Sequence, residues 1–288
     1  MSDRRIMLLP GGRAVLAENG PLRMVIQAWH GPDPRLELAV EAAKYAFDCL
    51  QRVAGQLAVL KRRPGDIHEL PSEPISREMI ASVRAIGDAD LTPMAAVAGT
   101  LADAVADWLF GQGLSRVIVD NGGDIAIRLA AGETTRVGLR PEIQRQEISH
   151  ILTLDSRHTS WGINTSGLGG RSFTCGFATA VTAIARTSSL ADAAATAVAN
   201  ACFVAGADAI QVPAAELDPN TDIPGLLVTV RVGSLSPAQT AEALSNASKK
   251  AEQLTQKGVI WGALVAIGKQ VILTANLYDC VAGLELNS

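Results

Sequence analysis

The segment SSLADAAATAVANACF, residues Ser188–Phe203, decides how the rest of the chain can fold. It has the composition of a buried helix, yet Asp192, Thr196 and Asn200 recur at intervals of four residues. Each step of four residues rotates only about 40° around an α-helix, so these side chains form one stripe. Oxygen ligands of this kind suit hard cations such as Mg²⁺ and Ca²⁺. The competing interpretation is a variant capping box made by Ser189 and Asp192, and the spacing alone favours that cap.

Composition limits the class of protein. The 288 residues are 48% hydrophobic and 19% charged, which suits a folded domain with an aliphatic core. The net charge is −4 and the longest basic run is Lys61–Arg63, so we expect no nucleic-acid partner. Apolar runs are too short for a membrane span. The four cysteines lack metal-ligand spacing, and we expect free thiols in a cytoplasmic protein.

The order of the expected elements indicates an α+β fold. A hairpin turns at Asn19–Gly20, a long helix starts at Pro34 and runs to Arg63, and another starts at Ser76. Strands and helices then mix without the regular alternation of a parallel sheet, which favours mainly antiparallel sheets. We expect a single domain over residues 1–288, with two closely packed lobes. LADAVADWL from Leu101 and LADAAATAV from Leu190 are alike, through either related halves or chance.

Three further segments carry candidate ligand contacts. In INTSGLGGRS, residues 163–172, the glycines predict either a backbone nest for an anion or a plain flexible turn. In VDNGGDIAI, residues 119–127, Asn-Gly-Gly predicts a hairpin first, and Asp120 and Asp124 flank it within reach of a ligand or metal. Thr92 before Pro93 predicts a helix start, and the small residues after it indicate a close approach of another element or a ligand.

Nucleophiles and bases are harder to place. Cys175 lies near the Gly-rich loop, where a thiolate could handle sulfur or redox chemistry, although an inert buried cysteine is the commoner case. The four histidines show no ligand spacing among themselves, and none stands out as a general base. The catalytic residues therefore stay unassigned.

Taken together, four segments resemble a known family. LTPMAAVAGTLADAVADWLF, VIVDNGGDIAI, INTSGLGGRSFTCGFATAVTAIA and SLADAAATAVAN occur in the order and spacing of the uncharacterised protein family 0280. That family is part of the ApbE-like superfamily, whose best-known members are FAD:protein FMN transferases. The resemblance covers Leu91–Asn200 most clearly.

The resemblance implies an ApbE-like α+β fold with a ligand cleft between two lobes. It implies that Asp192 and Thr196 bind Mg²⁺. It also implies a phosphate-bearing ligand, FAD or FMN, with Arg171 available for a bidentate phosphate contact. The ligand contacts expected on this basis are Thr92, Asn121, Gly122, Gly123, Asp124, Thr165, Ser166, Gly167 and Arg171.

Departures from the family pattern argue against flavin transfer. The transferases carry His-Ile-Ile-Asp-Pro-x-Thr-Gly before the metal helix, and this chain has LGGRSFTCGFATAVTAIA there. Family 0280 itself usually reads close to Gly-His-Ser-x-Ser-x-Gly-Lys-Ala-Asp, and the His, Lys and Asp are replaced by Arg171, Phe177 and Thr179. We therefore predict a ligand-binding protein whose status as an enzyme is open. The alternatives are a role in sulfur incorporation into homocysteine, with Cys175 handling sulfur, and a non-catalytic assembly partner or homo-oligomer.

Overall fold

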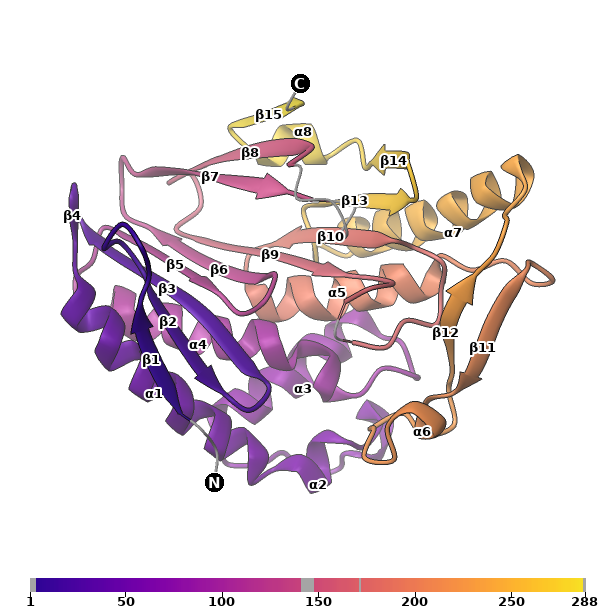
Figure 1. Cartoon of the computed structure of the whole chain (residues 1–288), viewed down its shortest axis with the longest axis horizontal. Coiled ribbons are helices and arrows are strands. Elements are labelled where there is room, and N and C mark those ends of the chain that lie inside the picture. Colours follow the sequence, from indigo (N-terminus) through magenta and orange to yellow (C-terminus); the bar gives the residue numbers. More distant parts are fainter. Residues whose placement is uncertain (1–3, 141–147, 171, 287–288) are drawn as a thin grey trace.

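The computed structural model describes residues 4–140, 148–170 and 172–286. A long antiparallel sheet runs through the middle of the molecule (Figure 1). Its strand order is β1-β2-β3-β5-β6-β9-β10-β13-β14, and the short β4 pairs with β3. The strands are β1 (Arg5–Leu8), β2 (Val15–Asn19), β3 (Leu22–His30), β4 (Asp33–Pro34), β5 (Arg116–Asp120), β6 (Asp124–Leu129), β9 (Ser160–Ser166), β10 (Ala180–Ala185), β13 (Gly262–Ile267) and β14 (Gln270–Leu273). The α+β class with antiparallel pairing is thereby confirmed.

Helices cover one face of this sheet and a small second sheet covers the other (Figure 1). The helical layer contains α1 (Leu36–Ala54), α2 (Leu57–Leu60), η1 (Pro64–Asp66), α3 (Pro74–Ile86), η2 (Pro93–Ala96), α4 (Val97–Phe110), α5 (Ser188–Ala201) and α7 (Pro237–Gln256). The second sheet has the order β15-β8-β7, from β7 (Thr134–Leu139), β8 (His150–Asp155) and β15 (Gly283–Leu286), beside α8 (Leu277–Cys280). A separate ribbon consists of β11 (Ala209–Pro213), α6 (Ala214–Leu217) and β12 (Leu227–Val232).

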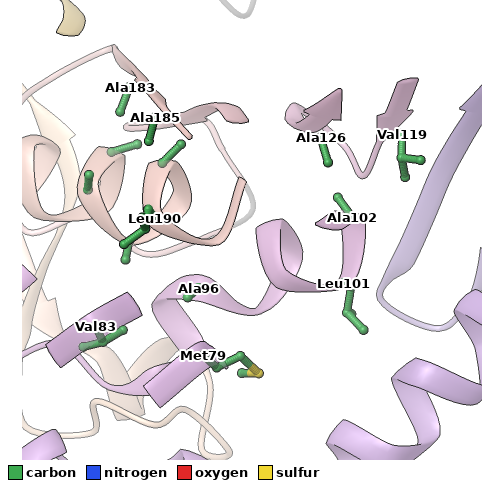
Figure 2. Packing of buried hydrophobic residues seen from close by; sticks show 14 of the residues in the cluster. Met79, Val83, Ala96, Leu101, Ala102, Val119, Ala126, Ala183, Ala185 and Leu190 are labelled. Carbon is green, nitrogen blue, oxygen red and sulfur yellow. The ribbon is translucent and has the colours of Figure 1, made fainter. Parts of the chain in front are cut away.

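Alternation along the central strands separates two hydrophobic cores. On β6, Ala126 belongs to the core beneath the helices, whereas Ile127 and Leu129 belong to the core beneath the small sheet. Figure 2 shows Ala102 of α4 directed toward Ala126 on the helical side. Successive strand residues point to opposite faces, so Asp124 and Arg128 also lie on the helical side.

Helix α5 sits at the centre of the helical layer because small residues let its neighbours come very close. A Cβ atom at Gly162 of β9 would lie 2.1 Å from the Thr187 carbonyl oxygen. One at Gly99 would lie 2.3 Å from the Ser188 carbonyl oxygen, and one at Gly176 would lie 2.0 Å from that of Ala199. Both ends of α5 are therefore enclosed by backbone, which accounts for its alanine-rich composition.

Three predicted helix starts differ from the structure. Asp33–Pro34 form β4 against the end of β3, so α1 begins only at Leu36, and it ends at Ala54 instead of continuing to Arg63. The helix expected from Ser76 begins at Pro74, because the Glu73 side chain accepts the Ser76 N–H and caps it. The helix expected from Pro93 begins as a 3₁₀ turn, η2, before α4 starts.

The division of the chain into two lobes with a cleft between them stays a prediction. Within the described ranges, no helix combines the length and apolar character needed to cross a bilayer.

Candidate functional site

Asp192 does not cap the N-terminus of its own helix, α5. Thr187 caps α5, since its hydroxyl accepts the Leu190 N–H. The Asp192 Oδ2 atom instead accepts the Gly99 N–H at 2.9 Å, in the first turn of the neighbouring helix α4. The self-capping interpretation is thus wrong, and the stripe on α5 faces the segment that starts α4.

The contact between α4 and α5 is reciprocal. The carboxylate of Asp103 on α4 accepts the N–H groups of Ser188 and Ser189 at 3.1 and 2.8 Å. Gly99 precedes Asp103 by four residues, and Ser188 precedes Asp192 by four. Each aspartate therefore binds the amide that lies one turn before the other, which is the pattern of a local two-fold axis. The similar sequences from Leu101 and Leu190 correspond at these two aspartates.

The two halves of this pair differ in one respect. Arg128 of β6 donates to Asp103 at 2.9 Å and to Asp107 at 2.6 Å, so an i, i+4 pair of acids holds a guanidinium group. The equivalent positions on α5 are Asp192 and Thr196. Among the residues that the structure describes, no lysine or arginine forms a salt bridge with Asp192. The α5 pair has the oxygen atoms of the α4 pair without its cation.

The environment of Asp192 penalises its charge. Burial raises the pKa of the Asp192 carboxyl group from 3.8 to about 7, and the charge of Asp103 adds to this rise. Hydrogen bonds from the Gly99 and Ala98 amides act in the opposite direction on that pKa, and they are outweighed. A neighbouring cation would favour the ionised form.

Polar side chains on the central sheet lie beside the contact between the starts of α4 and α5. Asn164 of β9 donates to Asp124 Oδ1 at 3.0 Å, and the Ser188 hydroxyl donates to Asn164 Oδ1 at 2.9 Å. The Asn121 amide donates to the Ala98 carbonyl oxygen at 3.2 Å. Two of the predicted ligand contacts, Asn121 and Asp124, thus lie near the helix starts that Asp192 and Asp103 bind.

The turn between β5 and β6 has the glycines it needs. Gly122 and Gly123 adopt φ values of 76° and 104°, and the Gly123 N–H donates to Asp120 Oδ1 at 2.7 Å. The hairpin interpretation of Asn-Gly-Gly is confirmed. These contacts account for Asp120 as a turn residue, while Asp124 faces the helices.

The segment Thr165–Ser166–Gly167 divides between the two faces of the sheet. Thr165 contacts the Thr182 hydroxyl at 2.8 Å, on the same side as Ile163, which belongs to the core under the small sheet. Ser166 alternates to the helical side, where its buried hydroxyl has no hydrogen-bond partner among the described residues. A Cβ atom at Gly167 would lie 2.7 Å from the Thr179 carbonyl oxygen. Arg171 lies outside the described residues.

Thr92 is enclosed. Its hydroxyl oxygen accepts the Met94 N–H at 3.2 Å and so caps η2, as predicted. The same hydroxyl donates to Asp222, which belongs to the loop between α6 and β12. Thr92 is only 2% exposed. No local sequence pattern points to Asp222, because 130 residues separate these two partners.

The far end of the α5 stripe holds the loop that contains Cys175. Asn200 Oδ1 accepts the Cys175 N–H at 2.9 Å, and the Cys175 carbonyl oxygen accepts from Gln211 and Thr229. Burial and the charge of Asp90 raise the pKa of the Cys175 thiol. A raised pKa lowers the thiolate fraction at neutral pH, which disfavours the sulfur-handling role.

The two ends of the α5 stripe contact different segments of the chain. Asp192 binds the start of α4, Asn200 binds the Cys175 loop, and Thr196 lies between them with 9% exposure. Within the described parts of the chain, no group of three or more His, Cys, Asp or Glu residues could hold a metal ion. Any cation at the stripe would need further oxygen atoms from a ligand or from water.

Comparison with known proteins identifies the family. A family model described as "AbpE bacteria" matches residues 6–273. The chain belongs to the AbpE bacteria family. Relatives of this AbpE member include a UPF0280 protein of Methanosarcina acetivorans, 32% identical over 205 residues, which are 69% of this chain and 78% of the relative. A UPF0280 protein of Methanospirillum hungatei is 39% identical over 118 residues, 41% of this chain. That second match spans about half of the relative, 48% of its length.

A solved structure supports the fold of the AbpE member. The apo form of the Pseudomonas stutzeri flavinyl transferase ApbE superposes with a TM-score of 0.51 and 14% sequence identity. The superposition covers 97% of this chain and 98% of that one. The predicted ApbE-like fold is thereby confirmed, and so is the resemblance to family 0280.

Four residues of the site were missed from the sequence. They are Asp103, Arg128, Asn164 and Asp222, and the likeness of LADAVADWL to LADAAATAV marks Asp103 as the equivalent of Asp192. Strand alternation within GINTS would have placed Asn164 beside Ser166 on one face. Arg128 and Asp222 carry no local signal, since each meets its partner only through the fold.

Proposed function

We propose that this protein binds a phosphate-bearing ligand, a flavin nucleotide, together with Mg²⁺ at Asp192 and Thr196. The observation that carries the proposal is the comparison of two equivalent i, i+4 pairs. Asp103 and Asp107 hold the guanidinium of Arg128, whereas Asp192 and Thr196 present oxygen atoms with no protein cation beside them among the described residues.

The donor chemistry fits Mg²⁺. This ion takes oxygen ligands in octahedral geometry, and it commonly binds one or two carboxylates while substrate phosphates and water complete its shell. Asp192 would supply the carboxylate and Thr196 the hydroxyl. Because the described residues hold no cluster of three or more His, Cys, Asp or Glu side chains, the remaining positions are left for phosphate oxygens and water, which makes metal and ligand binding interdependent. When bound, Mg²⁺ would neutralise phosphate charge.

The rest of the site suits a nucleotide. Ser166 supplies a buried hydroxyl without a partner in the described chain, close in sequence to the Gly-rich loop and Arg171. Such a loop can offer backbone N–H groups to phosphate, and arginine can bind phosphate with two parallel hydrogen bonds. The choice of flavin rests on the likeness in fold to a flavinyl transferase. Because the His-Ile-Ile-Asp-Pro segment of the transferases is replaced, the proposal is binding, with no catalytic residue assigned. We also propose that the protein is cytoplasmic, because its four cysteines are free and free thiols suit a reducing compartment.

Calorimetric titration tests the proposal. FAD, FMN and ADP are each titrated into the purified protein with and without Mg²⁺. We expect FAD to bind with an affinity that Mg²⁺ raises, and we expect Thr196→Val to remove most of that Mg²⁺ effect because it removes an oxygen ligand. Thr196→Ser is the matched control, since it keeps the hydroxyl. Flat titrations with all three ligands, in either condition, would refute the proposal.

A further inference from the structure

The ribbon of β11, α6 and β12, residues 209–232, is here called the strap. Figure 1 shows it beside the end of α5, apart from both larger sheets. Thr229 of β12 anchors the strap to the loop that contains Cys175, since its N–H donates to the Thr174 carbonyl oxygen at 2.8 Å. The segment between the strands, residues 218–226, is called the strap loop.

Two polar contacts connect the strap loop to the helical layer. Asp222 accepts a hydrogen bond from the Thr92 hydroxyl, and the Asn220 carbonyl oxygen accepts one from the Lys61 ammonium group. Lys61 and Thr92 both lie far from the strap loop in sequence, so these contacts exist only while the strap loop rests against the helices. Both are hydrogen bonds with a charged partner, which are stronger than neutral ones.

These contacts enclose Thr92 and occupy its hydroxyl group. The Thr92 hydroxyl donates to Asp222 and accepts from Met94, so both of these bonding directions are in use. The carboxylate of Asp222 would also repel the phosphate groups of an approaching ligand. A phosphate oxygen can therefore accept a hydrogen bond from the Thr92 hydroxyl only after Asp222 has moved away.

We propose that the strap loop is a gate over Thr92, held shut by the Asp222–Thr92 hydrogen bond and opened to admit the phosphate-bearing ligand. This proposal rests on the proposed function for the identity of the ligand. The latch, by which we mean the Asp222–Thr92 hydrogen bond, does not depend on that function.

The strap loop can move at little cost in buried surface. Residues 216–220 and 224–225 are exposed, and Leu217 and Leu227 at the margins of the loop are 49% and 53% exposed. The anchoring residues Ala214, Val228 and Thr229 are buried in the flanking elements. Local opening is favoured where backbone is exposed and apolar contacts are few. Displacement of the loop alone would thus leave the anchors in place.

Hydrogen exchange on the ligand-free protein tests the latch. In Asp222→Ala, we expect the amides of residues 218–226 to exchange about tenfold faster or more, because a charge-assisted bond is lost. Exchange in α5 should not change. Asp222→Asn keeps an acceptor oxygen for Thr92 and should stay closer to the wild type. Equal exchange of the strap loop in wild type and Asp222→Ala would overturn the proposal.

Stopped-flow binding then tests the gate. With FAD and Mg²⁺ as the probe, Asp222→Ala should raise the association rate constant by about the factor by which it speeds exchange. Faster exchange with an unchanged association rate constant would overturn the gate. If FAD does not bind to any variant, the proposed function fails, and the exchange result still decides whether Asp222 latches the loop.

Discussion

The raised pKa of Asp192 predicts a pH dependence of stability that one substitution should remove. In the folded protein this pKa is about 7, compared with 3.8 for an exposed aspartate. Between about pH 4 and pH 7 the folded state therefore keeps a proton that the unfolded state has released. The free energy of unfolding should fall as the pH rises through this window and then level off.

The magnitude follows from the size of the shift. Each pKa unit corresponds to about 1.4 kcal/mol, so a rise from 3.8 to about 7 amounts to about 4 kcal/mol. Asp192 keeps partial exposure to solvent, which screens its charge, so this figure is an upper limit. We expect Asp192 to contribute a loss of about 2–4 kcal/mol between about pH 4 and pH 8.

Asp192→Asn isolates this contribution. The asparagine side chain keeps an oxygen that can accept the Gly99 N–H, but it carries no charge at any pH. Urea unfolding across the pH window should show the variant losing about 2–4 kcal/mol less stability than the wild type. Asp48→Asn, on the exposed side of α1, is the matched control and should follow the wild type. Parallel curves for wild type and Asp192→Asn would refute the reasoning about Asp192.

Two further substitutions test the helix crossing itself. Gly99→Ala places a Cβ atom 2.3 Å from the Ser188 carbonyl oxygen, so urea unfolding should show that the free energy of unfolding falls by about 3 kcal/mol or more. The control is Gly65→Ala, whose Cβ atom would meet nothing within 4 Å, and it should stay within about 1 kcal/mol of the wild type. Arg128→Met removes the cation beside the buried Asp103, and the same measurement should show that the free energy of unfolding falls by about 3–5 kcal/mol. A fall below about 1 kcal/mol would show that Asp103 does not need a charged partner.

Much of the architecture follows from local sequence patterns. The Asn19–Gly20 turn, the hairpin around Gly122 and Gly123, and the burial of the α5 segment are all set by turn residues or by composition, and the structure has each of them. The start of α1 was misplaced because Asp33–Pro34 read as a helix start, whereas backbone pairing with the end of β3 prevails there. Strand pairing between distant segments outweighs a local capping preference.

The sequence predicts only part of the candidate site, because its other contacts join segments that are distant in sequence. Asp192 stands out by its spacing from Thr196 and Asn200, but its actual partner is the first turn of α4, 93 residues earlier in the chain. Helix spacing shows which side chains share a stripe, and only packing shows what that stripe faces. Asp222 is the clearest example, since its role depends on the strap loop reaching Thr92.

The position of the metal tests the central claim most directly. Crystals of the protein grown with FAD and Mn²⁺, an anomalous scatterer that stands in for Mg²⁺, should show a peak about 2 Å from both the Asp192 carboxylate and the Thr196 hydroxyl. Phosphate oxygens of the nucleotide should complete the coordination of that ion. A Mn²⁺ peak elsewhere, or bound FAD with no peak between these two side chains, would contradict the account.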